Sequence, residues 1–356
     1  MPVSVAPRYD QLRHRLRSEP RTWLITGVAG FIGSALLESL LGLEQMVVGL
    51  DNFSTGHQAN LDDVADRSGP LVKNFRMMRG DIRDQDACRE ACAGVDYVLH
   101  QAALGSVPRS IDDPLTSAHV NVDGSLNILL AARDGGVKRV VYASSSSVYG
   151  DSRNLPQSEE STGRPLSPYA ATKVADELFA EVFQRTYGLE VVGLRYFNVF
   201  GRRQDPDGPY AAVIPRWISN LVRGEPCRIF GDGETSRDFC YVDNAVQANL
   251  LSAAYAPSDS TGQAYNIACG QSTSLIQLFH LLRAGLSPYT RAAGSADPIF
   301  ENFRPGDVQR SLADISRAAA KLGYEPTHRV REGMTATIEW YAQAAGLGAP
   351  STSATV

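Results

Sequence analysis

The chain has 356 residues, enough to bury a large hydrophobic core and to form more than one domain. With 43% hydrophobic and 21% charged residues, its composition is that of an ordinary soluble globular protein. The formal net charge of -5 argues against a nucleic-acid partner. No apolar run is long enough to span a bilayer and the N-terminus has no signal-peptide core, so we expect a cytoplasmic protein with no membrane partner.

The cysteines and histidines are those expected of a cytoplasmic protein without a metal site. The five cysteines are odd in number and scattered, which favours reduced core thiols. The six histidines are dispersed without ligand spacing, so the sequence predicts no metal site. Residues 8–17 predict a short basic surface helix ahead of the first strand.

The first predicted βαβ unit organises the chain. Residues 22–26 have the length and apolar composition of a buried parallel strand, and a second such run, residues 46–50, leads to Asp51. A glycine-rich turn, residues 27–33, and an apolar-periodic helix lie between them. Asp51, with its neighbour Asn52, is expected to bind the adenosine ribose hydroxyls of a dinucleotide. The charge of Asp51 would repel a 2′-phosphate and no arginine follows closely, so the sequence predicts NAD rather than NADP.

Each glycine of this turn has a separate task. Gly27 permits the tight turn, Gly30 lets the backbone approach the pyrophosphate, and Gly33 lets helix and strand pack closely. The helix is expected to begin near Phe31 and Ile32. The pyrophosphate is therefore predicted to bind the amide groups and the positive end of this helix.

Alternation of strands and helices continues to about residue 197. Four further strands of the same sheet are predicted at residues 75–79, 95–100, 139–143 and 191–197. We therefore predict a Rossmann-type, doubly wound parallel α/β fold. The NAD-binding domain is expected at residues 1–197, with residues 237–262 returning to it. A smaller, mixed α/β C-terminal lobe for the substrate is expected at residues 198–356.

Residues that follow the third and fourth strands are expected to meet the cofactor. Asp81 would accept a hydrogen bond from the adenine and Ile82 would contact it through apolar atoms, although a plain turn is the alternative for Asp81. Residues 101–103, after the fourth strand, are small enough for the cofactor to pass close by. A long helical segment, residues 113–134, carries Asn121 on its predicted buried face. These further cofactor contacts are Gln101, Ala102, Ala103 and Asn121.

A tyrosine and a lysine form the predicted catalytic centre. Four serines, residues 144–147, follow the fifth strand at the sheet edge where ligands bind in doubly wound folds. Ser167 and Pro168 are suited to the cap and first position of a helix that carries Tyr169 and Lys173 on one face. The positive end of the helix and the ammonium both favour the phenolate, so the tyrosine can act as a base near neutral pH.

These motifs resemble the extended short-chain dehydrogenases/reductases that act on nucleotide sugars. More narrowly, the chain resembles bacterial UDP-N-acetylglucosamine 4-epimerases of O-antigen and capsule polysaccharide biosynthesis. The resemblance covers residues 8–343 and is carried by the G-x-x-G-x-x-G spacing at 27–33, the serine tip, the Tyr-x-x-x-Lys pair, and residues 101–110, 195–198, 200–206, 231–239 and 304–307.

The resemblance implies a role for each matched residue. Ser145, Tyr169 and Lys173 are the implied catalytic residues, with Tyr169 taking the O4 proton while NAD takes a hydride from C4 to give a 4-keto sugar. Tyr169, Lys173 and Tyr196 are also implied contacts of the cofactor. The implied substrate contacts are Ser106, Ser145, Ser146 near the acetamido group, Tyr169, Asn198, Arg237 and Arg304 at the diphosphate, Asp307 at the uridine ribose, and Ser311 beside C2.

The implied activity is an NAD-dependent 4-epimerase of UDP-N-acetylhexosamines, UDP-GlcNAc and UDP-GalNAc, working as a homodimer. One alternative is a UDP-uronate 4-epimerase acting on UDP-GlcNAcA, UDP-GalNAcA or UDP-GlcA, because the serine-rich strand tip also occurs in those enzymes. A 4,6-dehydratase is disfavoured because Ser146 and Ser147 stand where dehydratases carry Asp-Glu. A non-catalytic NAD-sensing protein is disfavoured because it would not need Tyr169.

Overall fold

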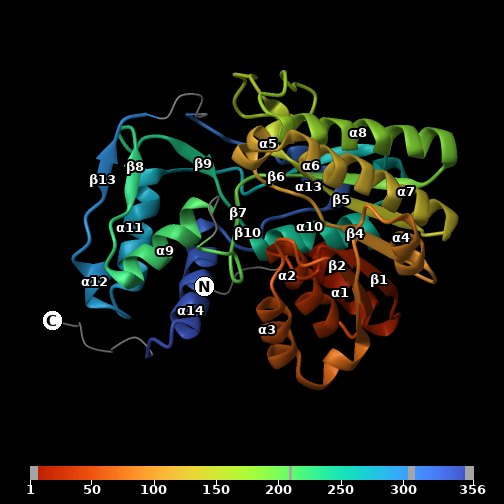
Figure 1. The fold of residues 1–356 in the computed structure, drawn as a ribbon, viewed down its shortest axis with the longest axis horizontal. Coiled ribbons are helices and arrows are strands. Elements are labelled where there is room, and N and C mark those ends of the chain that lie inside the picture. Colours follow the sequence, from red (N-terminus) through yellow and green to blue (C-terminus); the bar gives the residue numbers. More distant parts are fainter. Residues whose placement is uncertain (1–6, 208–210, 304–308, 349–356) are drawn as a thin grey trace.

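Figure 1 shows the computed structural model, which describes residues 7–207, 211–303 and 309–348. Its larger body holds a seven-stranded sheet with the order β11-β6-β5-β4-β1-β2-β3, and every neighbouring pair is parallel. This confirms the predicted Rossmann-type doubly wound sheet. The strands are β1 (Thr22–Thr26), β2 (Met46–Asp51), β3 (Phe75–Arg79), β4 (Tyr97–His100), β5 (Arg139–Ser145), β6 (Glu190–Tyr196) and β11 (Gln263–Ile267).

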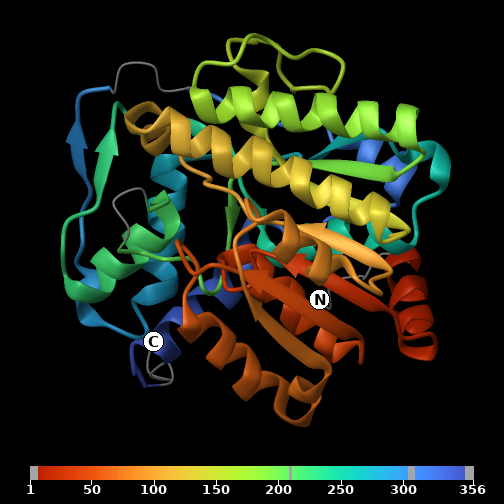
Figure 2. The same cartoon turned by 45° about the vertical axis from the view of Figure 1, so that its right-hand side comes forward.

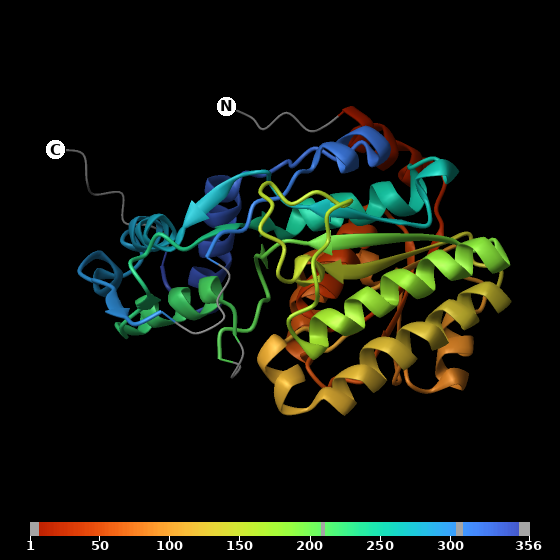
Figure 3. The ribbon, with the colours of Figure 1, turned by 90° about the horizontal axis from the view of Figure 1, so that it is seen from above.

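Helices cover both faces of the sheet. On one face α4 (Gln85–Cys92), α7 (Gly124–Asp134) and α8 (Pro168–Tyr187) lie side by side (Figure 2). Seen from above, the opposite face carries α10 (Val242–Ala254) and α2 (Phe31–Gly42) (Figure 3). The outer helices of that face are α1 (Pro7–Ser18) and α13 (Ser316–Leu322), which contact α10, and α3 (Gln58–Ser68), which packs on α2. Because both faces are covered, the central strands are almost wholly buried and apolar.

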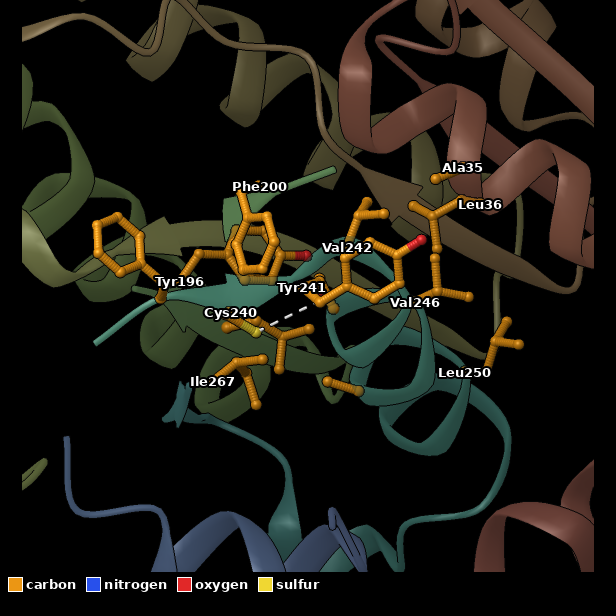
Figure 4. Close-up of a cluster of buried hydrophobic side chains, with 14 of the residues drawn as sticks. Ala35, Leu36, Tyr196, Phe200, Cys240, Tyr241, Val242, Val246, Leu250 and Ile267 are labelled. Atoms are coloured by element: carbon orange, nitrogen blue, oxygen red, sulfur yellow. Dashed lines mark hydrogen bonds between the residues drawn. The ribbon is translucent and has the colours of Figure 1, made fainter. Parts of the chain in front are cut away.

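One part of the hydrophobic core lies where α10 meets α2 and the sheet. Figure 4 shows Val242, Val246 and Leu250 of α10 beside Ala35 and Leu36 of α2. Aromatic side chains complete this cluster, with the rings of Phe200 and Tyr241 5.7 Å apart. A segment that lies some 200 residues after α2 in the chain therefore packs on α2 and on the sheet of the larger body.

The smaller body lies on the left in Figure 1. Its helices are α9 (Val213–Arg223), α11 (Leu275–Leu286), α12 (Arg291–Gly294) and α14 (Val330–Ala344). Three two-stranded pairs connect and complete it: β7 (Val199–Phe200) with β10 (Cys240–Tyr241), β8 (Arg228–Phe230) with β13 (Ile299–Glu301), and β9 (Ser236–Asp238) with β12 (Ser272–Ser274). Short helical segments elsewhere are α5 (Val107–Asp112), α6 (Pro114–Ala118) and the 3-10 turns Gly69–Asn74, Ser146–Tyr149 and Ser258–Ser260.

The structure differs from the sequence expectations at two places. A seventh strand, β11, pairs with β6, whereas the expected return to the larger body ended at residue 262. The segment expected as one helix, residues 113–134, is divided, because a π-helical turn (His119–Asp123) separates α6 from α7. Where the two domains divide stays a prediction. Among the described residues, no helix has both the length and the apolar character needed to cross a membrane.

Candidate active site

A cleft of about 540 Å³ opens at the carboxyl ends of the parallel strands. The strand order reverses between β1 and β4, and ligands of doubly wound folds bind at such a switch point. The cleft brings together most of the residues singled out from the sequence. Those that line it are Gly27, Gly30, Phe31, Ile32, Gly33, Asp51, Asn52, Asp81, Ile82, Gln101, Ala102, Ala103, Ser106, Ser145, Tyr169, Lys173, Tyr196 and Asn198.

The glycine turn is shaped as a dinucleotide requires. Gly27 has a φ of 69°, and a Cβ there would lie 2.8 Å from the backbone nitrogen of Ala102. A Cβ on Gly33 would lie 2.0 Å from the carbonyl oxygen of Gly27, so the helix packs on the turn only without a side chain. Helix α2 begins after Gly30 with no side-chain cap, which leaves its first amide groups available to an anion. These features fit the pyrophosphate of NAD.

Asp51 ties the glycine turn to the loop after β2. Its Oδ2 accepts a hydrogen bond from the backbone N–H of Ala29 at 2.9 Å, and its Oδ1 accepts one from Phe53 N–H at 2.8 Å. Each carboxylate oxygen has a second lone pair. Asp51 therefore has the capacity to accept from two ribose hydroxyls while holding the loop.

The Asp81 carboxylate accepts more hydrogen bonds from the protein itself than the sequence indicates. It accepts from Asn52 Nδ2 at 2.9 Å and from the backbone N–H, Nε and Nη2 of Arg83 at 2.9, 3.0 and 2.7 Å. The hydrogen bonds from Arg83 hold the pKa of this carboxyl well below its usual range. Since its acceptor positions are filled, a hydrogen bond from adenine would have to replace one of these donors.

The start of α8 places Tyr169 and Lys173 in the cleft. The Ser167 hydroxyl accepts from Ala170 N–H at 3.1 Å, so the predicted cap is confirmed, and Tyr169 N–H donates to Ser110 Oγ at 3.0 Å. Lys173 is 3% exposed. Burial alone would lower the pKa of Lys173, but the nearby Asp176 carboxylate and Tyr169 outweigh it and raise that pKa. The ammonium is thus kept charged beside the tyrosine.

Buried charges support the serine tip of β5. Ser144 Oγ donates to Glu177 of α8 at 2.5 Å, and Arg195 of β6 donates to the same carboxylate through Nε at 2.9 Å and Nη2 at 2.7 Å. Ser145, the next residue, caps the following 3-10 turn by accepting from Ser147 N–H at 3.1 Å. Ser145 is therefore held by its pairing with Tyr196 of β6 and by its cap on the following turn, next to a serine that is fixed on α8.

Side chains at the end of β6 form the far wall of the cleft. Tyr196 donates from its hydroxyl to Gln101 Oε1 at 3.2 Å and accepts from Asn249 Nδ2 at 2.7 Å. Asn198, with a φ of 35°, donates from Nδ2 to the carbonyl of Asp238 at 3.1 Å. Ser106 caps α5 by accepting from Arg109 N–H at 3.2 Å.

Several predicted site residues lie elsewhere. Asn121 is fully buried behind the cleft wall, where it accepts from Leu104 N–H at 2.8 Å and donates to Thr172 Oγ1 at 3.0 Å. Ser146, Arg237 and Ser311 do not line the cleft, and Ser311 is buried beside β9, donating its N–H to Ser236 O at 3.1 Å. The predicted Arg304 and Asp307 lie outside the described residues.

Sequence reasoning assigned no role to several segments that border the cleft, two loops among them. The loop after β2 contributes Ser54, Thr55 and Gly56, and the loop after β7 contributes Gln204 and Asp205. Residues 200–206 belong to the resemblance described above, but no function had been assigned to them. In the described parts of the chain, no group of three or more His, Cys, Asp or Glu side chains is arranged to hold a metal ion.

Comparison with known proteins agrees with this arrangement. The chain is 39% identical over 321 residues to UDP-glucose 4-epimerase of Mycolicibacterium smegmatis, covering 89% of this chain and 97% of that protein. It is 32% identical over 321 residues to UDP-glucuronate 4-epimerase of Thermodesulfobacterium geofontis, with 89% and 95% covered. The solved structure of UDP-N-acetylglucosamine 4-epimerase from Methanobrevibacter ruminantium M1, in complex with UDP-N-acetylmuramic acid, has a TM-score of 0.82 and 38% identity, covering 91% of this chain and 99% of that one. The model of the NAD dependent epimerase/dehydratase family matches residues 23–268, more than half of the chain, and the protein therefore belongs to this family.

Proposed function

We propose that the protein is an NAD-dependent 4-epimerase that interconverts UDP-GlcNAc and UDP-GalNAc. The observation that carries this proposal is that Ser145, Tyr169 and Lys173 line the same cleft as the glycine turn. Relatives and a solved neighbour that are named as UDP-sugar 4-epimerases support the reaction type. Residues 146 and 147 are serines, whereas an elimination would need the acid and base that an Asp-Glu pair supplies at these positions.

The residues divide the work between proton transfer and orientation. When bound, NAD supplies reversible hydride transfer at C4 of the sugar. Tyr169 takes the proton from the O4 hydroxyl and returns it at the end of the cycle, while Lys173 stabilises the phenolate. Ser145 hydrogen-bonds O4 and orients it. The 4-keto sugar must rotate between the two hydride transfers so that its other face meets the cofactor. A loosely held sugar and a firmly held UDP suit this rotation.

The proposal is tested by incubating the purified protein with UDP-GlcNAc, UDP-GlcNAcA, UDP-Glc and UDP-GlcA and separating the C4 epimers. UDP-GlcNAc is expected to equilibrate fastest, without net NADH release. Fastest turnover of a uronate would change the substrate class, and a 4-keto-6-deoxy product would identify a dehydratase. Stoichiometric NADH would identify a dehydrogenase.

The proposed preference for N-acetylated sugars comes from the resemblance, which implies that Ser311 lies beside C2 of the sugar, although in the structure this residue is buried beside β9 and does not line the described cleft. Epimerases limited to glucose and galactose tend to carry a tyrosine at the matching position, and serine leaves room for an acetamido group. Ser311→Tyr is expected to suppress UDP-GlcNAc turnover while sparing UDP-Glc, because a steric clash costs on the order of 1–3 kcal/mol. The ratio of the two turnover rates is the measurement. Equal loss of both activities would mean that Ser311 does not discriminate between the sugars, since a folding defect affects both alike.

We also propose a homodimer formed through the helices of one sheet face. Apolar side chains on α5, α6 and α8 are exposed, although these helices adjoin one another. They are Ile111, Leu115, Leu178 and Val182. Exposed apolar patches of this kind mark protein interfaces, and homodimers most often pair the same surface on both subunits. Light scattering of the purified protein measures the mass directly, and a monomer at micromolar concentration would contradict the proposal.

A further inference from the structure

A buried carboxylate lies directly behind the lysine of the cleft. Asp176 follows Lys173 by one turn of α8, and its Oδ2 accepts a hydrogen bond from Lys173 Nζ at 3.0 Å. The two side chains are 3% and 4% exposed, so both charges are withdrawn from water. A buried carboxylate is strongly unfavourable unless it is paired. Asp176 was not part of any motif recognised in the sequence, although its spacing places it near the lysine on the same helix.

The second oxygen of this carboxylate is unsatisfied. Oδ1 of Asp176 has no hydrogen-bond partner among the described residues. The hydroxyl of Ser125 on α7 is close enough to favour the charged carboxylate, but it donates its hydrogen to the carbonyl of Asn121 at 2.5 Å. Burial accordingly raises the pKa of Asp176. Asp176 Oδ1 is one of several buried side-chain atoms without a partner, but it belongs to a carboxylate that contacts a lysine of the cleft, so its retention there calls for an explanation.

Lys173 is the counter-charge of Asp176, because the other titratable groups around these two residues are neutral or paired elsewhere. From β4, His100 bonds Ser125 through Nε2 at 3.0 Å and Thr26 through Nδ1 at 2.7 Å, and burial lowers its pKa to about 3, so it is neutral. From β5, Tyr142 is buried, and this burial raises its pKa. On α8 itself, Glu177 is paired with Arg195 of β6 and Tyr169 faces the lysine.

We propose that Asp176 is a positioning residue for the Lys173 ammonium, and that it sets the pH range over which Tyr169 and Lys173 can work together. This inference rests on the proposed roles of Tyr169 and Lys173. An ammonium on a flexible four-carbon stem has three donors, and Asp176 accepts one of them from the side away from the cleft. The other donors are thereby directed toward the cleft, which Lys173 lines.

The charge of Asp176 acts on both members of the pair in a defined direction. A negative charge beside an ammonium favours its protonated form, so removal of Asp176 would lower the pH at which Lys173 loses its proton. The same negative charge disfavours a nearby phenolate, so its removal would lower the pH at which Tyr169 becomes a base. Both limbs of the pH–rate profile are therefore expected to move to lower pH together.

The decisive experiment is the pH dependence of kcat for Asp176→Asn. Asparagine keeps the size of the side chain and an oxygen that accepts from Lys173, but it carries no charge. Both limbs should move to lower pH by about one unit. Glu181→Gln is the matched control, because it removes the same charge from a side chain of the same helix that is 42% exposed, where Glu181 pairs with Arg185. Its profile should coincide with that of the wild type.

Loss of activity in Asp176→Asn with unmoved limbs would overturn the inference, because a purely structural role lowers activity without shifting the profile. If that variant fails to fold, Asp176→Glu decides: it retains the charge on a longer stem, so the limbs should stay in place while kcat falls. Limbs that move in Asp176→Glu would also overturn it. Tyr169→Phe distinguishes failure of this inference from failure of the proposed function. Unimpaired turnover in that variant would show that Tyr169 is not the base.

Discussion

Tyr169→Phe is expected to lower the turnover of the UDP-sugar by at least about 100-fold, because it removes the proposed general base. Binding of NAD should be unchanged. The contacts that position this residue in the structure use its backbone, since its N–H donates to Ser110 and its carbonyl accepts from Thr172 Oγ1. The start of α8 and the ammonium of Lys173 should therefore stay where they are. Steady-state turnover and the content of bound NAD after gel filtration are the two measurements.

Tyr187→Phe is the matched control for this variant. Tyr187 ends the same helix, is half exposed and packs on Phe183, with ring centroids 5.0 Å apart. Removal of its hydroxyl should leave turnover unaffected. Turnover of Tyr169→Phe within a few-fold of the wild type would show that another group takes the O4 proton. Loss of NAD together with activity would instead indicate that the tyrosine acts in cofactor binding.

The parts of the fold that could be predicted are those written in short stretches of sequence. The first βαβ unit and the cap at Ser167 depend on residues within a few positions of one another, and glycine spacing or a Ser-Pro pair reports them directly. The same holds for Tyr169 and Lys173, which share a face because they are one helical turn apart.

What could not be predicted depends on pairing between distant segments. β11 joins the sheet by pairing with β6 some 70 residues earlier, and its central residue Tyr265 is buried. The residues of β11, Gln-Ala-Tyr-Asn-Ile, alternate too weakly to signal a strand. Asp81 illustrates the same limit at the site, because the sequence shows an acidic residue after a strand but not that Arg83 occupies its oxygens.

Arg203 is the clearest case of a residue whose role only the structure reveals. An isolated arginine in a loop is most often solvated, yet this side chain is fully buried and pairs with Glu38 of α2 and with Asp63 of α3, the latter at 3.1 Å. Its backbone has a φ of 65°. The two following residues, Gln204 and Asp205, line the cleft, so the buried ion pairs hold this loop at the mouth of the cofactor site.

Arg203→Met is therefore expected to lower the free energy of unfolding by about 3 kcal/mol, because it leaves two partly buried carboxylates without this partner. Retention of NAD should fall as well, since the loop loses its attachment to α2 and α3. Denaturant unfolding gives the free energy, and the dissociation rate of NAD gives retention.

Arg223→Met is the control, because it makes the same chemical change in a pair with Asp207 whose side chains are 51% and 61% exposed. Exposed ion pairs contribute between about 0 and 1 kcal/mol, so this variant should resemble the wild type in both measurements. Equal destabilisation by the two variants would mean that burial of Arg203 adds nothing. Destabilisation by Arg203→Met with unchanged NAD dissociation would show that the ion pairs stabilise the fold but do not control NAD retention. The loop would then stay over the cleft through its other contacts. These are the ion pairs of Arg202 with Glu38 and Asp243 and the hydrogen bond from Tyr341 to the Gln204 carbonyl.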